Sequence, residues 1–177
     1  MGYLQYPTHA TEDIISGDDW DTNMVGNRGW LQSPPSGRLG VANNYTYNSN
    51  DIIAYSTVGI GGWLNGGVTL SATGEMMPNT AGVYVCSAGI FCYTPTIIAA
   101  QWQFSLMANI GGVAYCIAQS IGNSTYSYWV SVGNVANLGE TDYIYALMNL
   151  NGGAPNVTIF GNGNPQTYIA MAWKANV

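Results

Sequence analysis

The stretch Val83-Tyr-Val-Cys-Ser-Ala-Gly-Ile-Phe-Cys-Tyr93 is apolar at nearly every position. Its β-branched and aromatic side chains favour extended backbone, so we interpret it as one long strand. A strand with one face in water alternates apolar and polar residues, whereas this stretch is apolar on both faces. We therefore expect one face to pack inside a sandwich and the other to be covered by a partner subunit.

Shorter runs of the same type lie on both sides of this stretch, and Gly, Asn and Pro separate them. The sequence Asn109-Ile-Gly-Gly112 stands between two of the runs and predicts a hairpin turn. The whole pattern predicts an all-β domain of about ten strands. The expected strands are Leu39–Val41, Ile52–Val58, Val68–Leu70, Val83–Tyr93, Trp102–Asn109, Val113–Ser120, Tyr126–Val132, Tyr143–Leu150, Val157–Phe160 and Thr167–Lys174.

Composition and charge support a single β domain with a covered surface. The chain has 177 residues, which suits one domain, and only 7% of them are charged, against about 25% in an ordinary soluble domain. A helical bundle is disfavoured because its exposed faces would carry Lys and Glu. The net charge of −6 excludes nucleic acid as a main partner. A nearly uncharged surface indicates that other protein covers it.

The first 35 residues differ from the rest and form a predicted arm, residues 1–35, ahead of a body at 36–177. Pro34 and Pro35 mark the boundary because prolines end helices and favour extended backbone. Ser16-Gly-Asp-Asp19 offers helix-capping oxygens, which predicts a short helix from about residue 18 to 25, with 31 as its furthest end. Five of the nine acidic residues lie in this arm: Glu12, Asp13, Asp18, Asp19 and Asp21.

The sequence contains no combination of residues that would activate a nucleophile. His9 is the only histidine, and no nucleophile elbow or Cys–His pair accompanies it. Asp18, Asp19 and Asp21 flank Trp20 and could be imagined as glycosidase carboxylates. Adjacent positions on a short helix do not face each other across a cleft. We therefore interpret the three aspartates as the charged first turn of a helix. We expect no enzymatic activity and no catalytic residue.

Metal and cofactor sites are not expected either. The spacing Asp19-x-Asp21-x-Asn23 imitates the start of a calcium loop, but Met24 and Trp30 occupy the positions that require Gly and Glu. Phosphate-binding and dinucleotide-binding glycine motifs are missing. Cys86, Cys92 and Cys116 have neither zinc-ligand spacing nor a partner histidine. We expect buried free thiols, with a Cys86–Cys116 or Cys92–Cys116 bridge as the alternative.

The sequence contains no signal for secretion or for insertion into a membrane. The N-terminus shows no signal peptide, and no apolar run is long enough to cross a membrane, so we expect no membrane partner.

Aromatic residues are concentrated in the second half of the body, where they could form a sugar-binding platform or fill the sandwich and a subunit interface. They are Tyr126, Tyr128, Trp129, Tyr143, Tyr145, Tyr168 and Trp173.

Short motifs resemble two kinds of known protein. The segment Ile14-Ile-Ser-Gly-Asp-Asp-Trp-Asp-Thr-Asn23, followed by Asn27, is similar to a segment that opens many tailed-bacteriophage structural proteins. Ala81-Gly-Val-Tyr-Val85 and Gly139-Glu-Thr-Asp-Tyr-Ile-Tyr145 resemble strands of the C1q/TNF-like jelly roll, and Thr167-Tyr-Ile-Ala-Met-Ala172 would be its closing strand. The resemblance implies a ten-stranded antiparallel jelly-roll sandwich with a short N-terminal arm.

The resemblance also implies a function. C1q/TNF-like domains associate about a threefold axis, so we expect a homotrimer. Phage proteins of this type imply a capsid decoration, or cement, protein on the outer capsid surface of the virion, bound to the major capsid protein. The alternative is a receptor- or glycan-binding tip of a head or tail fibre; an enzyme and a secreted C1q-like binding protein rank below it. The capsid-anchor candidates are Asp18, Asp19, Trp20, Asp21, Met24, Arg28 and Trp30, and the trimer-interface candidates are Tyr84, Tyr143, Tyr145, Tyr168 and Trp173.

Overall fold

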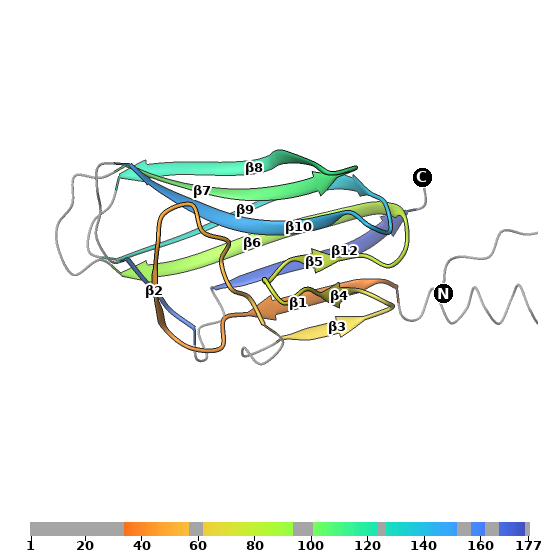
Figure 1. Cartoon of the computed structure of the whole chain (residues 1–177), viewed down its shortest axis with the longest axis horizontal. Coiled ribbons are helices and arrows are strands. Elements are labelled where there is room, and N and C mark those ends of the chain that lie inside the picture. The colour runs from red at the N-terminus through yellow and green to blue at the C-terminus, as the bar shows by residue number, and fades with distance from the viewer. Residues whose placement is uncertain are drawn as a thin grey trace, which may run out of the picture.

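A computed structural model describes residues 34–56, 62–93, 101–123, 127–151, 157–161 and 167–175 of the chain (Figure 1). These residues form twelve strands and contain no helix. The strands are β1 (Ser36–Gly40), β2 (Tyr45–Tyr47), β3 (Trp63–Asn65), β4 (Thr69–Leu70), β5 (Met76–Met77), β6 (Gly82–Tyr93), β7 (Gln101–Ile110), β8 (Val113–Asn123), β9 (Ser127–Leu138), β10 (Tyr143–Asn151), β11 (Val157–Ile159) and β12 (Tyr168–Ala175). The expected helix in the arm lies outside the described residues.

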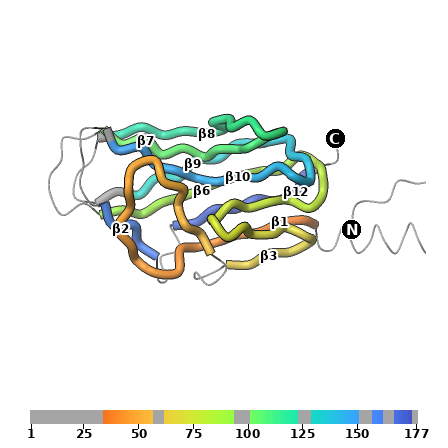
Figure 2. Tube along the Cα trace, viewed as in Figure 1, coloured from red at the N-terminus to blue at the C-terminus, as the bar shows by residue number. Residues whose placement is uncertain are grey.

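The strands form two antiparallel sheets that lie one on the other, as Figure 2 shows. Sheet A has the order β2-β11-β6-β12-β1-β3, with β9 paired to β6. Because β9 pairs with β6 over its whole length, β12 and β11 share the opposite edge of β6. Sheet B has the order β4-β5-β10-β7-β8. The arrangement is a jelly-roll sandwich, so the predicted all-β fold class is confirmed.

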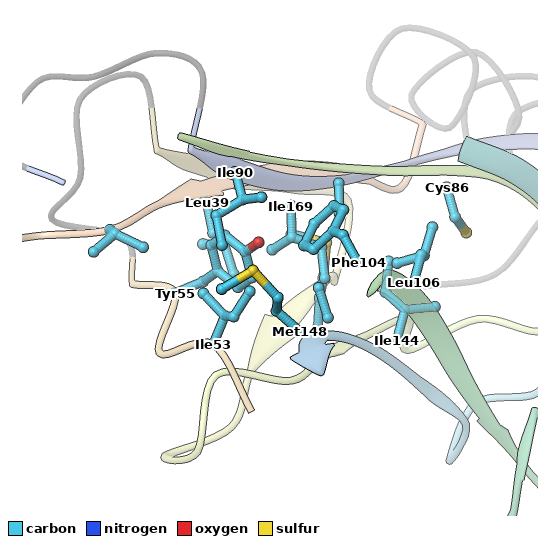
Figure 3. Packing of buried hydrophobic residues seen from close by; sticks show 14 of the residues in the cluster. Leu39, Ile53, Tyr55, Cys86, Ile90, Phe104, Leu106, Ile144, Met148 and Ile169 are labelled. Carbon is cyan, nitrogen blue, oxygen red and sulfur yellow. The ribbon is translucent and has the colours of Figure 1, made fainter. Parts of the chain in front are cut away.

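The core lies between the sheets and is built from every second residue of the long strands. On β6 the inward residues are Tyr84, Cys86, Ala88, Ile90 and Cys92, and none has any exposed surface. Facing strands of sheet B supply apolar side chains in the same alternation, because successive residues of a strand point to opposite faces. Figure 3 shows the packing of both sets of side chains. From sheet B they are Phe104, Leu106 and Ala108 on β7, and Ile144, Ala146 and Met148 on β10.

The turn between β7 and β8 is the predicted hairpin. Gly111 and Gly112 have φ angles of 58° and 84°, the left-handed region that a two-residue type I′ turn requires at both positions. The buried carboxylate of Asp142 accepts the Gly111 N–H at 2.9 Å and the Gly139 N–H at 2.7 Å. Asp142 therefore ties this hairpin to the turn between β9 and β10.

Some expected elements differ from those in the structure. The segment expected as one strand from Ile52 makes only isolated bridges within its described part, from Ile52 to Leu147 and from Ser56 to Gly40. The short strands β2, β3 and β5 were not predicted, because neighbouring strands rather than local propensity define pieces of two or three residues. The number of strands in the described residues is therefore twelve and not about ten.

The three cysteines are free thiols, as expected, and neither alternative bridge forms. Cys86 and Cys92 are buried as expected, whereas Cys116 on the edge strand β8 is exposed, so the prediction of a buried thiol is wrong for this residue. Burial raises the pKa of Cys86 from 9.0 to about 12 because the thiolate would lose its hydration. A thiol with such a high pKa is inert, so Cys86 serves to fill the core.

Candidate functional site

The outer surface of sheet A is flat at its centre and apolar at its ends. Outward residues of β6 and β9 stand directly opposite each other, with Val85 beside Val135 and Phe91 beside Trp129. Between these pairs Ser87 stands opposite Gly133, and both have little or no side chain. Outward residues of β12 add Ala170 and Ala172 to the same small-residue centre. We call this surface the sheet A face: Arg38, Trp63, Val85, Ser87, Phe91, Tyr93, Trp129, Gly133, Val135, Tyr168, Ala170 and Ala172.

The large apolar side chains that remain exposed in the described residues are concentrated in two neighbouring regions. Five of the eight lie on the sheet A face and three lie on β8. Their exposed fractions range from 38% for Tyr93 to 55% for Ile121. A patch of this kind on a folded domain usually marks a binding surface. The eight are Trp63, Val85, Tyr93, Val113, Tyr115, Ile121, Trp129 and Val135.

Strands β8 and β9 form the edges of their sheets on the same side of the sandwich. They approach each other, and the Asn134 side-chain amide donates to the Ile117 carbonyl at 2.6 Å. Soluble proteins usually protect such edges with charged residues or proline, yet neither strand contains any. The unprotected edge therefore adds main-chain hydrogen-bonding groups to the exposed apolar side chains of this region.

Arg38 is the only charged residue on the sheet A face. Its guanidinium carbon lies 4.8 Å from the centre of the Tyr168 ring, which is cation–π distance. Trp63 stands directly opposite Arg38 on the neighbouring strand β3. The Tyr168 ring stabilises the guanidinium through its quadrupole but leaves the positive charge in place, so the face carries a single cation among uncharged side chains.

The structure separates the five residues expected at a trimer interface. Tyr84 points into the core, has no exposed surface and donates its hydroxyl to the Thr80 carbonyl at 2.8 Å. Burial raises its pKa to about 12. Including Tyr84 in the interface was therefore wrong, because it lies on the inward side of β6. Tyr168 lies on the sheet A face, whereas Trp173 is partly buried against the core.

The other two, Tyr143 and Tyr145, lie on the outer surface of sheet B, since Ile144 between them points into the core. Their ring centres are 5.9 Å apart. Partial burial, the neighbouring Tyr143 and Glu75 all raise the pKa of Tyr145. These two tyrosines therefore do not belong to the surface that carries Tyr168, and the structure assigns them to a separate region.

All seven capsid-anchor candidates, from Asp18 to Trp30, lie outside the described residues. Sequence reasoning missed Val85, Val135, Tyr115 and Ile121 as surface residues. Val85 could have been found from the alternation along Val83–Tyr93 once the inward side was known. Val135 lies some fifty positions away along the chain, and only the pairing of β6 with β9 brings it beside Val85.

The described residues contain neither a metal-binding cluster nor a membrane-spanning helix. No group of three or more His, Cys, Asp or Glu side chains in this part of the chain could hold a metal ion. None of the described segments forms a helix with the length and apolarity that crossing a membrane requires. The sheet A face and β8 are therefore the strongest candidate site in the described part of the molecule.

The fold is that of a TNF-like jelly roll, and a solved structure shares it. The protein described as Eiger TNF from S. frugiperda is similar, with a TM-score of 0.56 and 12% sequence identity. The similarity covers 80% of this chain and 93% of that chain. No protein-family model matches the sequence, and no curated protein matches it. At this level of identity the comparison establishes the fold alone.

Proposed function

We propose that the chain is a homotrimeric virion structural protein that decorates the outer surface of a capsid. The main observation in support of an oligomer is that the exposed large apolar side chains lie on the sheet A face and on β8. Subunit contact would remove these side chains from water, at about 25 cal/mol per Å² of apolar surface. The nearly uncharged sheet A face offers few ions whose desolvation would oppose that gain.

Two different surfaces on one subunit favour a ring over a twofold dimer. A twofold dimer uses one self-complementary patch on both copies. The sheet A face and β8 are distinct, so one copy can place its β8 edge against the sheet A face of the next copy. A head-to-tail contact of this kind closes into a ring when its rotation permits. The resemblance to C1q/TNF-like domains indicates that the ring has three members.

The capsid role rests on the arm. Its segment from Ile14 to Asn23 is similar to one that opens many tailed-phage structural proteins. This segment contains three acidic residues, and Glu12 and Asp13 just ahead of it bring the arm to five of the nine in the chain. In the proposed arrangement Trp20 inserts into a pocket of the major capsid protein, and Asp18, Asp19 and Asp21 pair with its basic residues. Aromatic anchors of this type dominate the energy of many interfaces.

A decoration protein needs no chemistry, because it stabilises the shell by mass action. A ligand that binds only the assembled shell stabilises it by about 2.7 kcal/mol per site at a hundredfold excess over its Kd. Three arms on one trimer raise the effective concentration of the second and third arm after the first has docked. Many symmetric sites therefore give a large total effect from weak individual contacts.

Electron microscopy of particles labelled with antibodies against the chain tests the proposal. Particles from a lysate that contains the chain should carry the label over the surface of their icosahedral heads. Particles assembled without the chain should release their DNA at a lower temperature. Label at the tips of fibres, or particles without label, would contradict capsid decoration, and tip labelling would support the glycan-binding alternative.

The anchor residues have their own test within the same assay. Trp20→Ala in the full chain should reduce the number of bound trimers on stripped particles at least tenfold, while the mass of the trimer in solution stays the same. Thr141→Ala, an exposed position in the turn before β10, serves as the matched control and should bind normally. Unchanged occupancy of the Trp20→Ala variant would show that the arm is not the anchor.

A further inference from the structure

The outer surface of sheet B carries a second, chemically different set of side chains. Strands β10, β7 and β8 lie side by side in this sheet (Figure 1). Residues of β10 and β7 between those of the core point outward, and they include aromatic rings and uncharged amides. We call this surface the tyrosine–amide face: Gln103, Asn109, Gln119, Tyr143, Tyr145 and Asn149.

The pairing of the strands sets the spacing of these groups. Tyr143 stands directly opposite Asn109, and Asn149 stands directly opposite Gln103. The two pairs are six residues apart along β10, which corresponds to about 20 Å. Tyr145 lies between them and belongs to the aromatic end. An extended ligand of a few units could therefore contact the rings at one end and the amides at the other.

The two tyrosine rings form one partly exposed aromatic surface. Their centres are 5.9 Å apart and their planes are inclined by 41°. Both residues are only half-buried. Aromatic rings in this position provide apolar contact area, and each phenol adds a hydroxyl that can donate and accept hydrogen bonds.

The charged side chains of the described residues narrow the class of ligand that the tyrosine–amide face could bind. The two cations of the described residues lie on other strands, Arg38 on β1 and Lys174 on β12, both in sheet A. The acid beside Tyr145 is Glu75, whose carboxylate accepts hydrogen bonds from the hydroxyls of Ser71 and Thr73. An anionic ligand would find no positive partner on this surface and would meet the charge of Glu75.

We propose that the tyrosine–amide face binds a neutral oligosaccharide. The apolar C–H face of a sugar ring packs on Tyr143 and Tyr145, while the amides of Asn109, Gln103 and Asn149 exchange hydrogen bonds with its hydroxyls. The face lies on the opposite side of the sandwich from the sheet A face. Its residues on β7 and β10 therefore stay open when subunits associate, and only Gln119 lies on β8, the strand that meets the neighbouring subunit in the proposed ring.

Isothermal titration of the full chain with maltohexaose, cellohexaose, chitohexaose and mannohexaose tests this inference. At least one of these neutral sugars should bind, and Tyr145→Ala should weaken its binding about tenfold, which corresponds to about 1.4 kcal/mol. Tyr143→Phe and Tyr145→Phe keep the rings and should keep most of the affinity. Asn149→Ala should weaken binding, whereas Asn48→Ala, an exposed amide outside the face, should not.

The outcomes that would overturn the inference are specific. They are failure of all four neutral sugars to bind, binding of dextran sulfate in their place, or unchanged affinity in Tyr145→Ala and Asn149→Ala. The melting temperature of each variant shows that it is folded, and Asn149→Ala carries the test if Tyr145→Ala is not folded. A sugar-binding monomer that leaves capsids unlabelled would refute the proposed function and leave this inference intact.

Discussion

Asp142 shows how one buried side chain connects two turns. Asp142 is 7% exposed, and its carboxylate accepts the N–H of Gly111 in the β7–β8 hairpin and the N–H of Gly139 in the turn that connects sheet A to sheet B. Removing a buried acceptor leaves its donors without partners, and each orphaned donor costs about 1 to 3 kcal/mol. The position therefore contributes to stability through backbone groups that are distant in sequence.

Substitution of this residue gives the first prediction. Asp142→Ala should lower the free energy of unfolding by about 2 to 4 kcal/mol, and Asp142→Asn by about half as much because one acceptor oxygen remains. Urea unfolding followed by tyrosine and tryptophan fluorescence measures the difference. Glu140→Ala, at an exposed position two residues away, should stay within about 0.5 kcal/mol of the unchanged protein. Equal effects at both positions would contradict the role of Asp142.

Cys86 gives the second prediction, which concerns alkaline stability. Its pKa rises from 9.0 to about 12 on folding because burial removes the hydration of the thiolate. Above pH 9 the folded chain therefore holds a proton that the unfolded chain has lost. Stability rises with pH only where the unfolded state binds more protons, so here it falls. The stabilising contribution of the protonated Cys86 thiol is complete below pH 9 and is lost as the pH rises towards 12.

The melting temperature should thus decline from about pH 9 upward. Tyr45 and Tyr84 have pKa values raised from 10.0 to about 12 by burial, and they extend the decline above pH 10. In Cys86→Ala the decline between pH 9 and 10 should be shallower, because one buried thiol has been removed. Identical pH profiles for the two proteins would show that Cys86 is not the group that titrates.

At the scale of elements, the paired strands β6 and β9 carry an apolar end of the sheet A face. Val85 and Val135 are directly opposite each other, 47% and 49% exposed. Within the described residues of one subunit, no other segment buries them. In the proposed trimer both are covered by the neighbouring subunit, so a charge placed here would have to be desolvated without a partner.

Val135→Lys should therefore dissociate the oligomer while each subunit stays folded. Light scattering at micromolar concentration should show a mass near that of one chain, and circular dichroism should show an unchanged β spectrum. Ala72→Lys places the same charge in the exposed turn between β4 and β5 and should leave the oligomer intact. An intact oligomer in Val135→Lys would place the interface elsewhere.

Local signals in the sequence predicted the long elements and failed for the short ones. The stretch at Val83–Tyr93 and the turn at Asn109–Gly112 were found because β propensity and paired glycines act within a few residues. A strand that is apolar on both faces does not reveal which side is inward, so Tyr84 was assigned to the surface and Val85 was missed. The strand pairing that joins Val85 to Val135 is a property of the tertiary fold and leaves no local pattern.

At the scale of the whole molecule, the two outer surfaces of the sandwich have different chemistry. The sheet A face and the edge strand β8 of sheet B carry the exposed large apolar side chains of the described residues, whereas strands β7 and β10 of sheet B present tyrosines and amides on their outer side. This asymmetry supports one surface for association and one for contact with solvent or ligand. A monomer in solution would leave the apolar surface and two unprotected strand edges open to aggregation.

The mass of the unmodified chain in solution tests the central claim most directly. Size-exclusion chromatography with light scattering at micromolar concentration should give a single species of three times 18.9 kDa. The same mass should persist in high salt, because burial of uncharged surface rather than ion pairing holds the subunits together. A clean monomer of 18.9 kDa would contradict the account of the sheet A face as a subunit interface.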